Sequence, residues 1–341
     1  MKQKKVTFDD IAKYTGFSKT TISRYFNNPD SLTLENQEKI AKALEELNYN
    51  ENKLAKVLAN GKSEFVGIIV PNLYLHYYSA MLNELLTSYA DYNYKFMVFV
   101  SNNDKETEEK YIRELLAYKI EGLIVSSHTL PSEQLASYHI PIVAIEREAE
   151  HICGVTTDNY MGAVQATSLL IKNKCDILIH INVFFPENVP SYGRIRGFQD
   201  VCTEHHINHV LIQKDFGNTY EDTSLQLKLI FEEIESKYQG MKKGIFLAND
   251  TYASIFLNFL FQKYGKLPDD YRIVGFDNSP IASEAILPIS TIGQQIEKIA
   301  HETMDLLVLQ MEEMKKRKPS PLKTPIHKQV TPIVIRRETT D

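Results

Sequence analysis

The sequence predicts a small all-α helix-turn-helix head followed by an α/β body of two doubly wound parallel-sheet subdomains. Three observations support this prediction. Two short amphipathic segments separated by Gly16 open the chain. From about Phe65 the helical periodicity gives way to continuous apolar runs that alternate with amphipathic stretches, a pattern typical of buried parallel strands. The pattern then repeats in the second half of a 341-residue chain, which is longer than one compact domain usually is.

The head begins with a helix that Thr7 and Asp10 cap in an acidic variant of the capping box. Gly16 ends this helix, and Ser18 caps a second one in which Ile22 and Phe26 lie four residues apart. A third helix follows a Thr33 cap, and the unit is complete by about residue 49. The residues expected to form its core are Phe8, Ile11, Ala12, Ile22, Phe26, Ile40, Ala43, Leu44 and Leu47.

The charge of the chain is unevenly distributed between head and body. Residues 1–62 hold 11 Lys and Arg against 8 Asp and Glu, whereas residues 63–341 hold 27 against 36. DNA phosphates attract a basic surface through counterion release, so the polar faces of the helix pair are expected to meet DNA. The alternative interpretation of the basic excess alone is a solvated helix face.

The body is predicted to contain two sets of buried strands. The runs of the first set are Val66–Pro71, Phe96–Val100, Gly122–Ser126 and Ile142–Ile145. Those of the second set are Asp176–Ile181, Val210–Ile212, Gly244–Ala248 and Arg272–Phe276. A helix over 104–118, a long helix beginning near Gln294 and a closing strand over Val330–Ile335 complete the expected elements.

Polar residues follow several of these strands, where ligands of doubly wound sheets bind. They are Asn72, His76-Tyr77-Tyr78, Glu146-Arg147, Asn249-Asp250 and Asp277-Asn278. A cleft lined by carboxylates, amides, an arginine and tyrosines suits hydroxyl-rich or anionic small molecules. The alternative for each residue taken singly is a cap on the following helix.

Between head and body, residues 50–61 form a short helix-favouring segment that ends at Asn60-Gly61. It carries Leu54, Val57 and Leu58, and it is too short to be a stable helix alone. Such a segment can fold against a symmetry mate and a minor groove, where a leucine can unstack a base step. A plain interdomain connector is the alternative.

The chain resembles the lactose-repressor and galactose-repressor (LacI/GalR) family of bacterial transcription regulators. The resemblance rests on residues 10–24, on Glu46-Leu-Asn-Tyr49 and on Asn52-Lys-Leu-Ala-x-x-Leu-Ala59. It implies that Lys19 and Thr20 read the major groove, that Arg24 makes a further base or backbone contact, and that Leu58 is the hinge-helix wedge. The expected DNA contacts are Thr7, Ser18, Lys19, Thr20, Thr21, Ser23, Arg24, Asn27, Asn52, Ala55 and Leu58. Glu51 departs from the family's usual proline.

The same resemblance implies a periplasmic-binding-protein-like body with an effector in the cleft between its subdomains. Ser191–Phe198 is similar to an effector-contact segment, which points to Arg194. Ala248-Asn-Asp250 and Gly275-Phe-Asp277 are similar to two further motifs, which point to Asn249 and Asp277. The residues expected to line the pocket by matching position are Tyr77, Tyr78, Glu146 and Gln294.

The expected organisation is a DNA-binding domain over 1–50, a hinge or linker over 51–62, and an effector-binding and dimerisation core over 63–341. Within the core, the N-subdomain is expected at about 63–158 and 294–322, and the C-subdomain at about 159–290 and 325–341. The expected function is a homodimeric repressor of a carbohydrate-utilisation operon that binds a near-palindromic operator and responds to a small sugar or sugar derivative. The alternatives are a purine-type corepressor-dependent regulator and a transport-type sugar-binding protein.

Several other kinds of protein and site are not indicated. No apolar run approaches the roughly 20 residues of a membrane span, and no signal peptide opens the chain, so a cytoplasmic protein without membrane contact is expected. Cys153, Cys175 and Cys202 are far apart and are expected to be reduced. Asn60-Gly-Lys-Ser63 lacks the leading glycine of a phosphate loop, and His205 and His209 lack the remainder of a zinc motif. The basic stretch 315–328 is expected to be a solvated connector, and no catalytic residue, metal or cofactor is expected.

Overall fold

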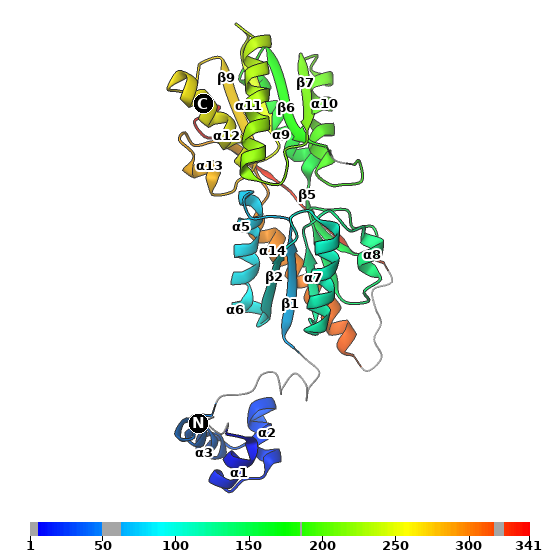
Figure 1. The fold of residues 1–341 in the computed structure, drawn as a ribbon, viewed down its shortest axis with the longest axis vertical. Coiled ribbons are helices and arrows are strands. Elements are labelled where there is room, and N and C mark those ends of the chain that lie inside the picture. The colour runs from blue at the N-terminus through cyan, green and yellow to red at the C-terminus, as the bar shows by residue number, and fades with distance from the viewer. Residues whose placement is uncertain (1–5, 50–62, 185, 317–323) are drawn as a thin grey trace. The chain divides into compact units, whose positions relative to one another are not determined.

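The computed structural model describes residues 6–49, 63–184, 186–316 and 324–341. The chain divides into two compact units, Met1–Lys62 and Ser63–Asp341, which are described separately below (Figure 1). No helix in the described parts of the chain is long and apolar enough to cross a membrane.

Residues 6–49 of the first unit form a bundle of three helices with one short 3-10 turn. Its elements are α1 (Phe8–Thr15), α2 (Lys19–Asn27), η1 (Pro29–Ser31) and α3 (Leu34–Glu46). Gly16 ends α1 with a φ of 74°, a left-handed conformation that glycine adopts without strain. Ile11, Ile22 and Ile40 are fully buried where the three helices meet, and Phe8 stacks on Phe26 at a ring-centroid distance of 5.2 Å.

The second unit contains two six-stranded sheets, which define two lobes. The first sheet has the order β11-β5-β4-β3-β1-β2, and all of its pairings are parallel. Its strands are β1 (Phe65–Val70), β2 (Lys95–Val100), β3 (Gly122–Val125), β4 (Ile142–Ile145), β5 (Cys153–Thr157) and β11 (His327–Val330). We call the lobe built on this sheet the N-lobe.

Helices cover both faces of the N-lobe sheet because successive strand residues point to opposite faces. Ile68 of β1 packs with α5 and α14, whereas its neighbour Ile69 packs with α7 and α8. The helices are α5 (His76–Thr87), α6 (Tyr89–Tyr92), α7 (Lys105–Ala117), α8 (Ser132–Ala136) and α14 (Ile296–Lys315). The apolar runs of the sequence are therefore strands buried on two sides.

The C-lobe sheet has the order β12-β10-β9-β8-β6-β7, and only its edge strand β12 is antiparallel. Its strands are β6 (Ile177–Val183), β7 (His209–Lys214), β8 (Lys243–Leu247), β9 (Tyr271–Asp277), β10 (Ser290–Gly293) and β12 (Ile333–Ile335). Helices α11 and α12 cover one face, and α9 and α10 cover the other. The helices are α9 (Asn159–Lys172), α10 (Tyr192–Glu204), α11 (Tyr220–Lys237), α12 (Asp250–Tyr264) and α13 (Ile281–Glu284).

The structure differs from the sequence-based expectation at three places. Strands β5 and β10 were not expected, because each is a short run that contains glycine and hydroxyl residues rather than a long aliphatic stretch. The expected closing strand 330–335 is two strands, β11 and β12, separated at Thr331-Pro332. Because Pro332 has no N–H for a strand ladder, the chain leaves one sheet there and enters the other. Consequently β11 belongs to the N-lobe sheet, although residues 325–341 were expected in the C-subdomain.

Candidate functional site

The expected DNA-contact residues of the head gather on and beside α2. Ser18 caps this helix, since its hydroxyl accepts a hydrogen bond from the Thr21 N–H at 3.1 Å. Thr7, Ser18, Lys19, Thr20, Arg24 and Asn27 are exposed, and Thr21 and Ser23 are half-buried. Asn52, Ala55 and Leu58 lie outside the described residues.

The exposed cations of α2 are available to a polyanion. Lys19 forms an ion pair with Asp9 at 2.7 Å, but both side chains are more than half exposed, so the pair is weak. The Arg24 side chain makes no ion pair or hydrogen bond with the residues that the structure describes, whereas its backbone carbonyl accepts from the Asn28 N–H. A helix that presents a lysine, an arginine and hydroxyl side chains on one capped segment has the chemistry needed to contact phosphates and base edges.

A cavity of about 110 Å³ lies between the two lobes. All seven residues expected to line an effector pocket line it, and they come from both lobes: Tyr77, Tyr78, Glu146, Arg194, Asn249, Asp277 and Gln294. The other lining residues, which the sequence analysis did not single out, are Leu75, His128, Asn182, Val183, Ser191, Ala248 and Tyr252. His128 follows β3 closely and Ser191 begins the Ser191–Phe198 segment, so both carried a signal that could have identified them.

Arg194 is held by protein groups on three sides. Its Nε donates to Asn159 Oδ1 at 2.7 Å, its Nη1 donates to the Ala248 carbonyl at 2.5 Å, and its guanidinium lies 3.7 Å from the centroid of the Phe276 ring. Gly197 allows this arrangement, because a Cβ there would lie 2.5 Å from the Tyr160 carbonyl oxygen. The close approach of α9 and α10 therefore sets the position of Arg194 in the cavity wall.

Two chains of hydrogen bonds run through the wall of the cavity. Glu146 accepts from the Thr157 N–H and, at 2.8 Å, from Asn159 Nδ2, so the amide of Asn159 links Glu146 of the N-lobe to Arg194 of the C-lobe. Gln294 accepts from the Thr157 hydroxyl at 2.7 Å and donates to Asp277. Asp277 is thereby connected to the end of strand β5.

Burial shifts the ionisable groups of the cavity. It raises the pKa of Glu146 and, more strongly, of Asp277, while the nearby Arg194 acts in the opposite direction on both. Burial also lowers the pKa of His128 to about 4, with a further contribution from Arg147. Glu146 and Asp277 have φ values of 53° and 110°, a strained backbone that is often found at functional sites.

Two hydroxyl groups of the cavity are buried without a partner among the described residues. They are Tyr77 OH and Ser191 Oγ. A buried polar atom without a hydrogen bond costs about 1–3 kcal/mol, so unpaired hydroxyls at a cavity indicate groups that a bound molecule satisfies.

Hydrogen bonds at three places link the two lobes. The Thr251 hydroxyl of α12 lies 3.2 Å from the His76 backbone nitrogen, which donates to it, and 2.9 Å from His76 Nδ1. Tyr74 and Thr223 hydroxyls meet at 3.3 Å, and Asn103 Nδ2 donates to Asn218 Oδ1 at 2.9 Å. These few hydrogen bonds join loops and the first turns of helices in the two lobes, and a change in the lobe arrangement can break them.

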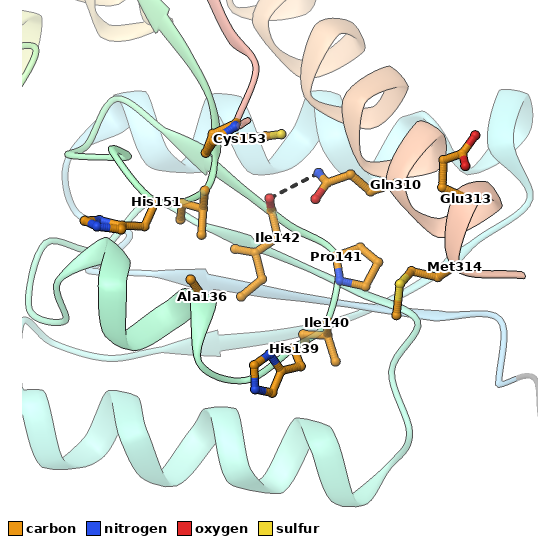
Figure 2. Close-up of a pocket in the computed structure, with 12 residues that line it drawn as sticks. Ala136, His139, Ile140, Pro141, Ile142, His151, Cys153, Gln310, Glu313 and Met314 are labelled. Atoms are coloured by element: carbon orange, nitrogen blue, oxygen red, sulfur yellow. Dashed lines mark hydrogen bonds between the residues drawn. The ribbon is translucent and has the colours of Figure 1, made fainter. Parts of the chain in front are cut away.

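A second cavity, of about 280 Å³, lies in the N-lobe beside the start of β4, the start of β5 and the end of α14 (Figure 2). Its wall is mainly apolar, including Ile140, Ile142 and Met314, and Gln310 uses its amide nitrogen to donate to the Ile142 carbonyl at 3.2 Å. None of the buried atoms that lack a partner in the described chain lies in this wall. The second cavity therefore lacks the unpaired hydroxyl groups found at the first one among the described residues.

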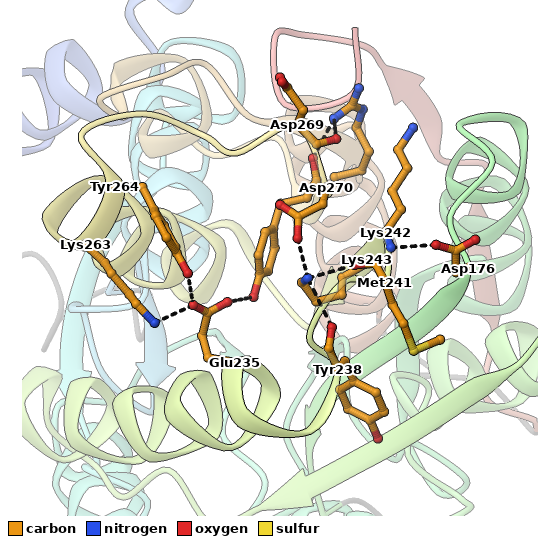
Figure 3. Close-up of polar contacts among 12 residues, drawn as sticks. Asp176, Glu235, Tyr238, Met241, Lys242, Lys243, Lys263, Tyr264, Asp269 and Asp270 are labelled. Atoms are coloured by element: carbon orange, nitrogen blue, oxygen red, sulfur yellow. Dashed lines mark hydrogen bonds and ion pairs between the residues drawn. The ribbon is translucent and has the colours of Figure 1, made fainter.

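Other polar clusters have partners of their own. In the C-lobe, Glu235 accepts from Lys263, Tyr264 and Tyr271, and buried Lys243 donates to Asp270 at 2.6 Å (Figure 3). Ligand atoms of Glu148, Glu150 and His151 lie within 4.8 Å of one another, but Glu148 already accepts from Ser132 and from the Glu150 N–H. These clusters tie loops and helices together.

Comparisons with known proteins agree with this architecture. Residues 7–52 match the description "Bacterial regulatory proteins, lacI family", residues 63–224 match "Periplasmic binding proteins and sugar binding domain of LacI family", and residues 169–340 match "Periplasmic binding protein-like domain". The sucrose operon repressor of Streptococcus mutans is 31% identical over 88% of this chain and 91% of its own. The ribose operon repressor of Halalkalibacterium halodurans is 27% identical over 98% and 97%.

Solved structures share the fold of the chain. A lac repressor dimer bound to operator and the anti-inducer ONPF superposes with a TM-score of 0.80, at 20% identity over 99% of both chains. A regulator from Alkaliphilus metalliredigens in complex with D-xylulofuranose gives a TM-score of 0.68, at 25% identity over 82% of this chain and 100% of its own. With a helix-turn-helix head, a two-lobed body and these matches, the chain belongs to the lacI family of bacterial regulatory proteins.

Proposed function

We propose that this chain is a sequence-specific repressor of a carbohydrate-utilisation operon, and that a small sugar or sugar derivative in the cavity between the lobes controls its binding to the operator. The observation that carries the proposal is the convergence of seven expected effector residues on one cavity that also contains two unpaired hydroxyl groups. The family match and the sugar-operon relatives support the same conclusion. The proposal includes no catalytic step, and such a regulator works in the cytoplasm, where the nucleoid lies.

The proposed organisation is a DNA-binding head over 1–50, a hinge over 51–62 and a core over 63–341. Two copies bind a near-palindromic operator, because the two-fold symmetry of a dimer is matched by two half-sites. Lys19, Thr20 and Arg24 are proposed to contact base edges or phosphates. Leu58 is proposed to insert into the minor groove.

The regulation is a linkage between two binding events. A sugar changes operator affinity only to the extent that it prefers one lobe arrangement over the other, and DNA then changes sugar affinity by the same factor. The hydrogen bonds between His76 of α5 and Thr251 of α12 are proposed to differ between the two arrangements.

Two measurements test the proposal. Selection of binding sites from genomic fragments by the purified full chain should recover a near-palindromic sequence. A thermal-shift screen of sugars, sugar phosphates, sugar acids and nucleobases should identify a molecule that also changes affinity for that sequence. Failure to recover any preferred sequence, with or without the screened compounds, would rule out the regulator.

The hinge is tested by a separate variant. Leu58→Ala should weaken specific binding and reduce DNA bending, which gel shifts with circularly permuted fragments measure. Leu34→Ala is the matched control in the head, because the Leu34 side chain is 76% exposed on α3. If both variants bent DNA equally, Leu58 would not insert into the minor groove.

A purine-type corepressor system is the second candidate function. Three aromatic side chains, Tyr77, Tyr78 and Tyr252, line the cavity and offer faces on which a nucleobase could stack. In that case a nucleobase, and no sugar, should stabilise the protein and tighten operator binding. A transport-type sugar-binding protein is a weaker alternative, because it has no use for the helix-turn-helix head.

A further inference from the structure

Strand β6 carries two buried polar side chains among apolar ones. Alternation along the strand points Leu178, His180 and Asn182 toward α9 and α10. Ile179 and Ile181, which lie between them in the sequence, point to the opposite face of the sheet. His180 and Asn182 are both fully buried. Because a buried polar group costs free energy unless it is hydrogen-bonded, the bonds of this pair indicate its role.

The surroundings of His180 fix which of its ring nitrogens carries the hydrogen. Nδ1 lies 2.9 Å from the Phe246 carbonyl oxygen, which can only accept, so Nδ1 is the donor. The ring stacks on the Phe246 ring at a centroid distance of 4.2 Å, and burial, with Arg194 acting in the same direction, lowers the pKa of His180 to about 3. At neutral pH the imidazole is therefore uncharged, and its Nε2 is an acceptor.

His180 in turn fixes the amide of Asn182. Asn182 Nδ2 lies 3.0 Å from His180 Nε2 and donates to it, and Asn182 Oδ1 accepts from the Val183 N–H at 2.8 Å. A flipped amide would lose both bonds, because Oδ1 would then face the lone pair of Nε2 and Nδ2 would face an N–H group. Asn182 Nδ2 has a second hydrogen, for which the described residues provide no acceptor.

We propose that Asn182 donates this second hydrogen to an acceptor atom of the effector, and that His180 is the residue that positions the donor. Asn182 lines the cavity between the lobes, whereas His180 is not among its described lining residues and acts through the amide. The inference rests on the proposed function and adds two residues that no motif of the sequence indicates. A histidine that only filled the core would leave effector affinity independent of its ability to accept a hydrogen bond.

The state of His180 can be measured without an effector. Nitrogen-15 spectra of the histidine side chains in the full chain should contain one imidazole that keeps the neutral Nδ1–H tautomer between about pH 5 and about pH 8. The signals of this imidazole should be absent from the spectrum of His180→Gln. A His180 that titrates in this range, or that carries its hydrogen on Nε2, would overturn the inference, because Nε2 could then not accept from Asn182.

Effector affinity tests the donor itself. The probes are D-ribose, D-glucose, D-fructose and sucrose, the phosphate monoesters of these sugars, hypoxanthine and guanine, each titrated into the full chain. Asn182→Ala should weaken the affinity of a probe that binds by about threefold to tenfold, the loss expected for one hydrogen bond. Asn173→Ala is the matched control and should leave affinity unchanged, because the Asn173 amide donates to the Leu169 carbonyl at 3.0 Å and does not line the cavity.

A double-mutant cycle tests the positioning role of His180. His180→Phe keeps an aromatic ring against Phe246 but removes the acceptor, so it should weaken binding by about as much as Asn182→Ala. His180→Gln keeps a carbonyl oxygen that can accept from Asn182, and its affinity should stay closer to that of the parent chain. In the Asn182→Ala background, His180→Phe should cause no further loss, because the group that it positions is gone.

Leu178→Val is the control for loosening of the core around the pair. Leu178 is fully buried on the same face of β6. The substitution should lower the melting temperature, because it removes a buried methylene group, and it should leave effector affinity unchanged.

Four outcomes would overturn the inference in addition to the wrong state of His180. Equal affinity of Asn182→Ala and the parent chain would reject the ligand contact. A further loss from His180→Phe in the Asn182→Ala background, or an equal loss from Leu178→Val, would show that His180 acts on the fold of the lobe. Absence of binding by every probe would also contradict the contact, while the operator selection independently shows whether the regulator itself stands.

Discussion

The polar side chains proposed to bind a partner are mostly exposed in the head and mostly buried in the cavity between the lobes. In the head, the described residues proposed for DNA lie within one short segment, and most are exposed, with partners that belong to the same segment. In the cavity, the polar residues come from segments between Tyr77 and Gln294, and most are buried and bonded to one another. A flat, charged surface can be built by one helix, whereas a closed site must satisfy its own polar groups before it can bind a ligand.

The largest effect is expected from a substitution in the small core of the head. Ile22→Ala should destabilise the head by about 2–5 kcal/mol, because Ile22 is fully buried against Ile11 and Ile40 in a bundle with few other buried side chains. Operator binding should be lost while sugar binding by the body persists. Circular dichroism melts and sugar titrations of the same sample measure both, and a parallel loss of sugar binding would show that the two units do not fold independently.

The second test removes the cation of the cavity. Arg194→Ala should weaken effector binding by about tenfold to a hundredfold, the loss of a hydrogen bond to a charged group, and should leave operator binding in place. Arg196→Ala, two residues further along α10 and exposed, is the matched control. An unchanged response of the Arg194 variant to the effector in a gel-shift titration would reject the proposed cavity.

The third test is made on the exposed surface of the head. Arg24→Ala should cost about 1–3 kcal/mol of operator affinity if Arg24 contacts a base edge, and specificity should relax at that position. Lys42→Ala is the control, because Lys42 is an exposed cation of the same unit and its only described partner is Glu46 at 4.0 Å. If both variants lost the same affinity for operator and for unrelated DNA, Arg24 would contribute only a non-specific attraction to phosphates.

The smallest expected effect is a dependence of lobe closure on pH. Thr251 accepts from the His76 N–H and can therefore donate to Nδ1 only while the imidazole is neutral. Burial lowers the pKa of His76 from its ordinary 6.5, with Glu284 acting in the opposite direction, so this contact is complete above about pH 6.5 and is lost as pH falls through the lowered pKa. Effector affinity should therefore fall severalfold as the pH is lowered from about 7.5 to about 5.

Substitution of His76 tests the origin of that pH dependence. His76→Gln should reduce the pH dependence, and the part that remains belongs to the cavity carboxyls, whose pKa values burial raises; His205→Gln, on an exposed helix end, should leave it unchanged. The pKa values of His128 and His180 are lowered by burial to about 4 and about 3, so these groups titrate below the window. A profile that is unchanged in the His76 variant would assign the pH dependence to another group.

Much of the site could be predicted from the sequence because the chemistry followed strand ends and recognisable segments. Tyr77, Glu146, Asn249 and Asp277 were found in this way, and all of them line the cavity. Asn182 could not be found, because it lies inside strand β6 and has no turn or cap signal. Asn159 was missed for another reason, since it looks like an ordinary first residue of a helix and its link between Glu146 and Arg194 exists only in the folded chain.

The sequence by itself determined the local elements: the caps at Thr7, Ser18 and Thr33, the break at Gly16 and the apolar runs of the strands. These follow from short-range sterics and periodicity, which a few neighbouring residues specify. Only the tertiary structure decided that the last strands divide between two sheets at Pro332, and that two hydroxyls at the cavity have no partner among the described residues. Hydrogen-bond partners and burial depend on segments far apart in the chain, so they become defined only when the two lobes pack together.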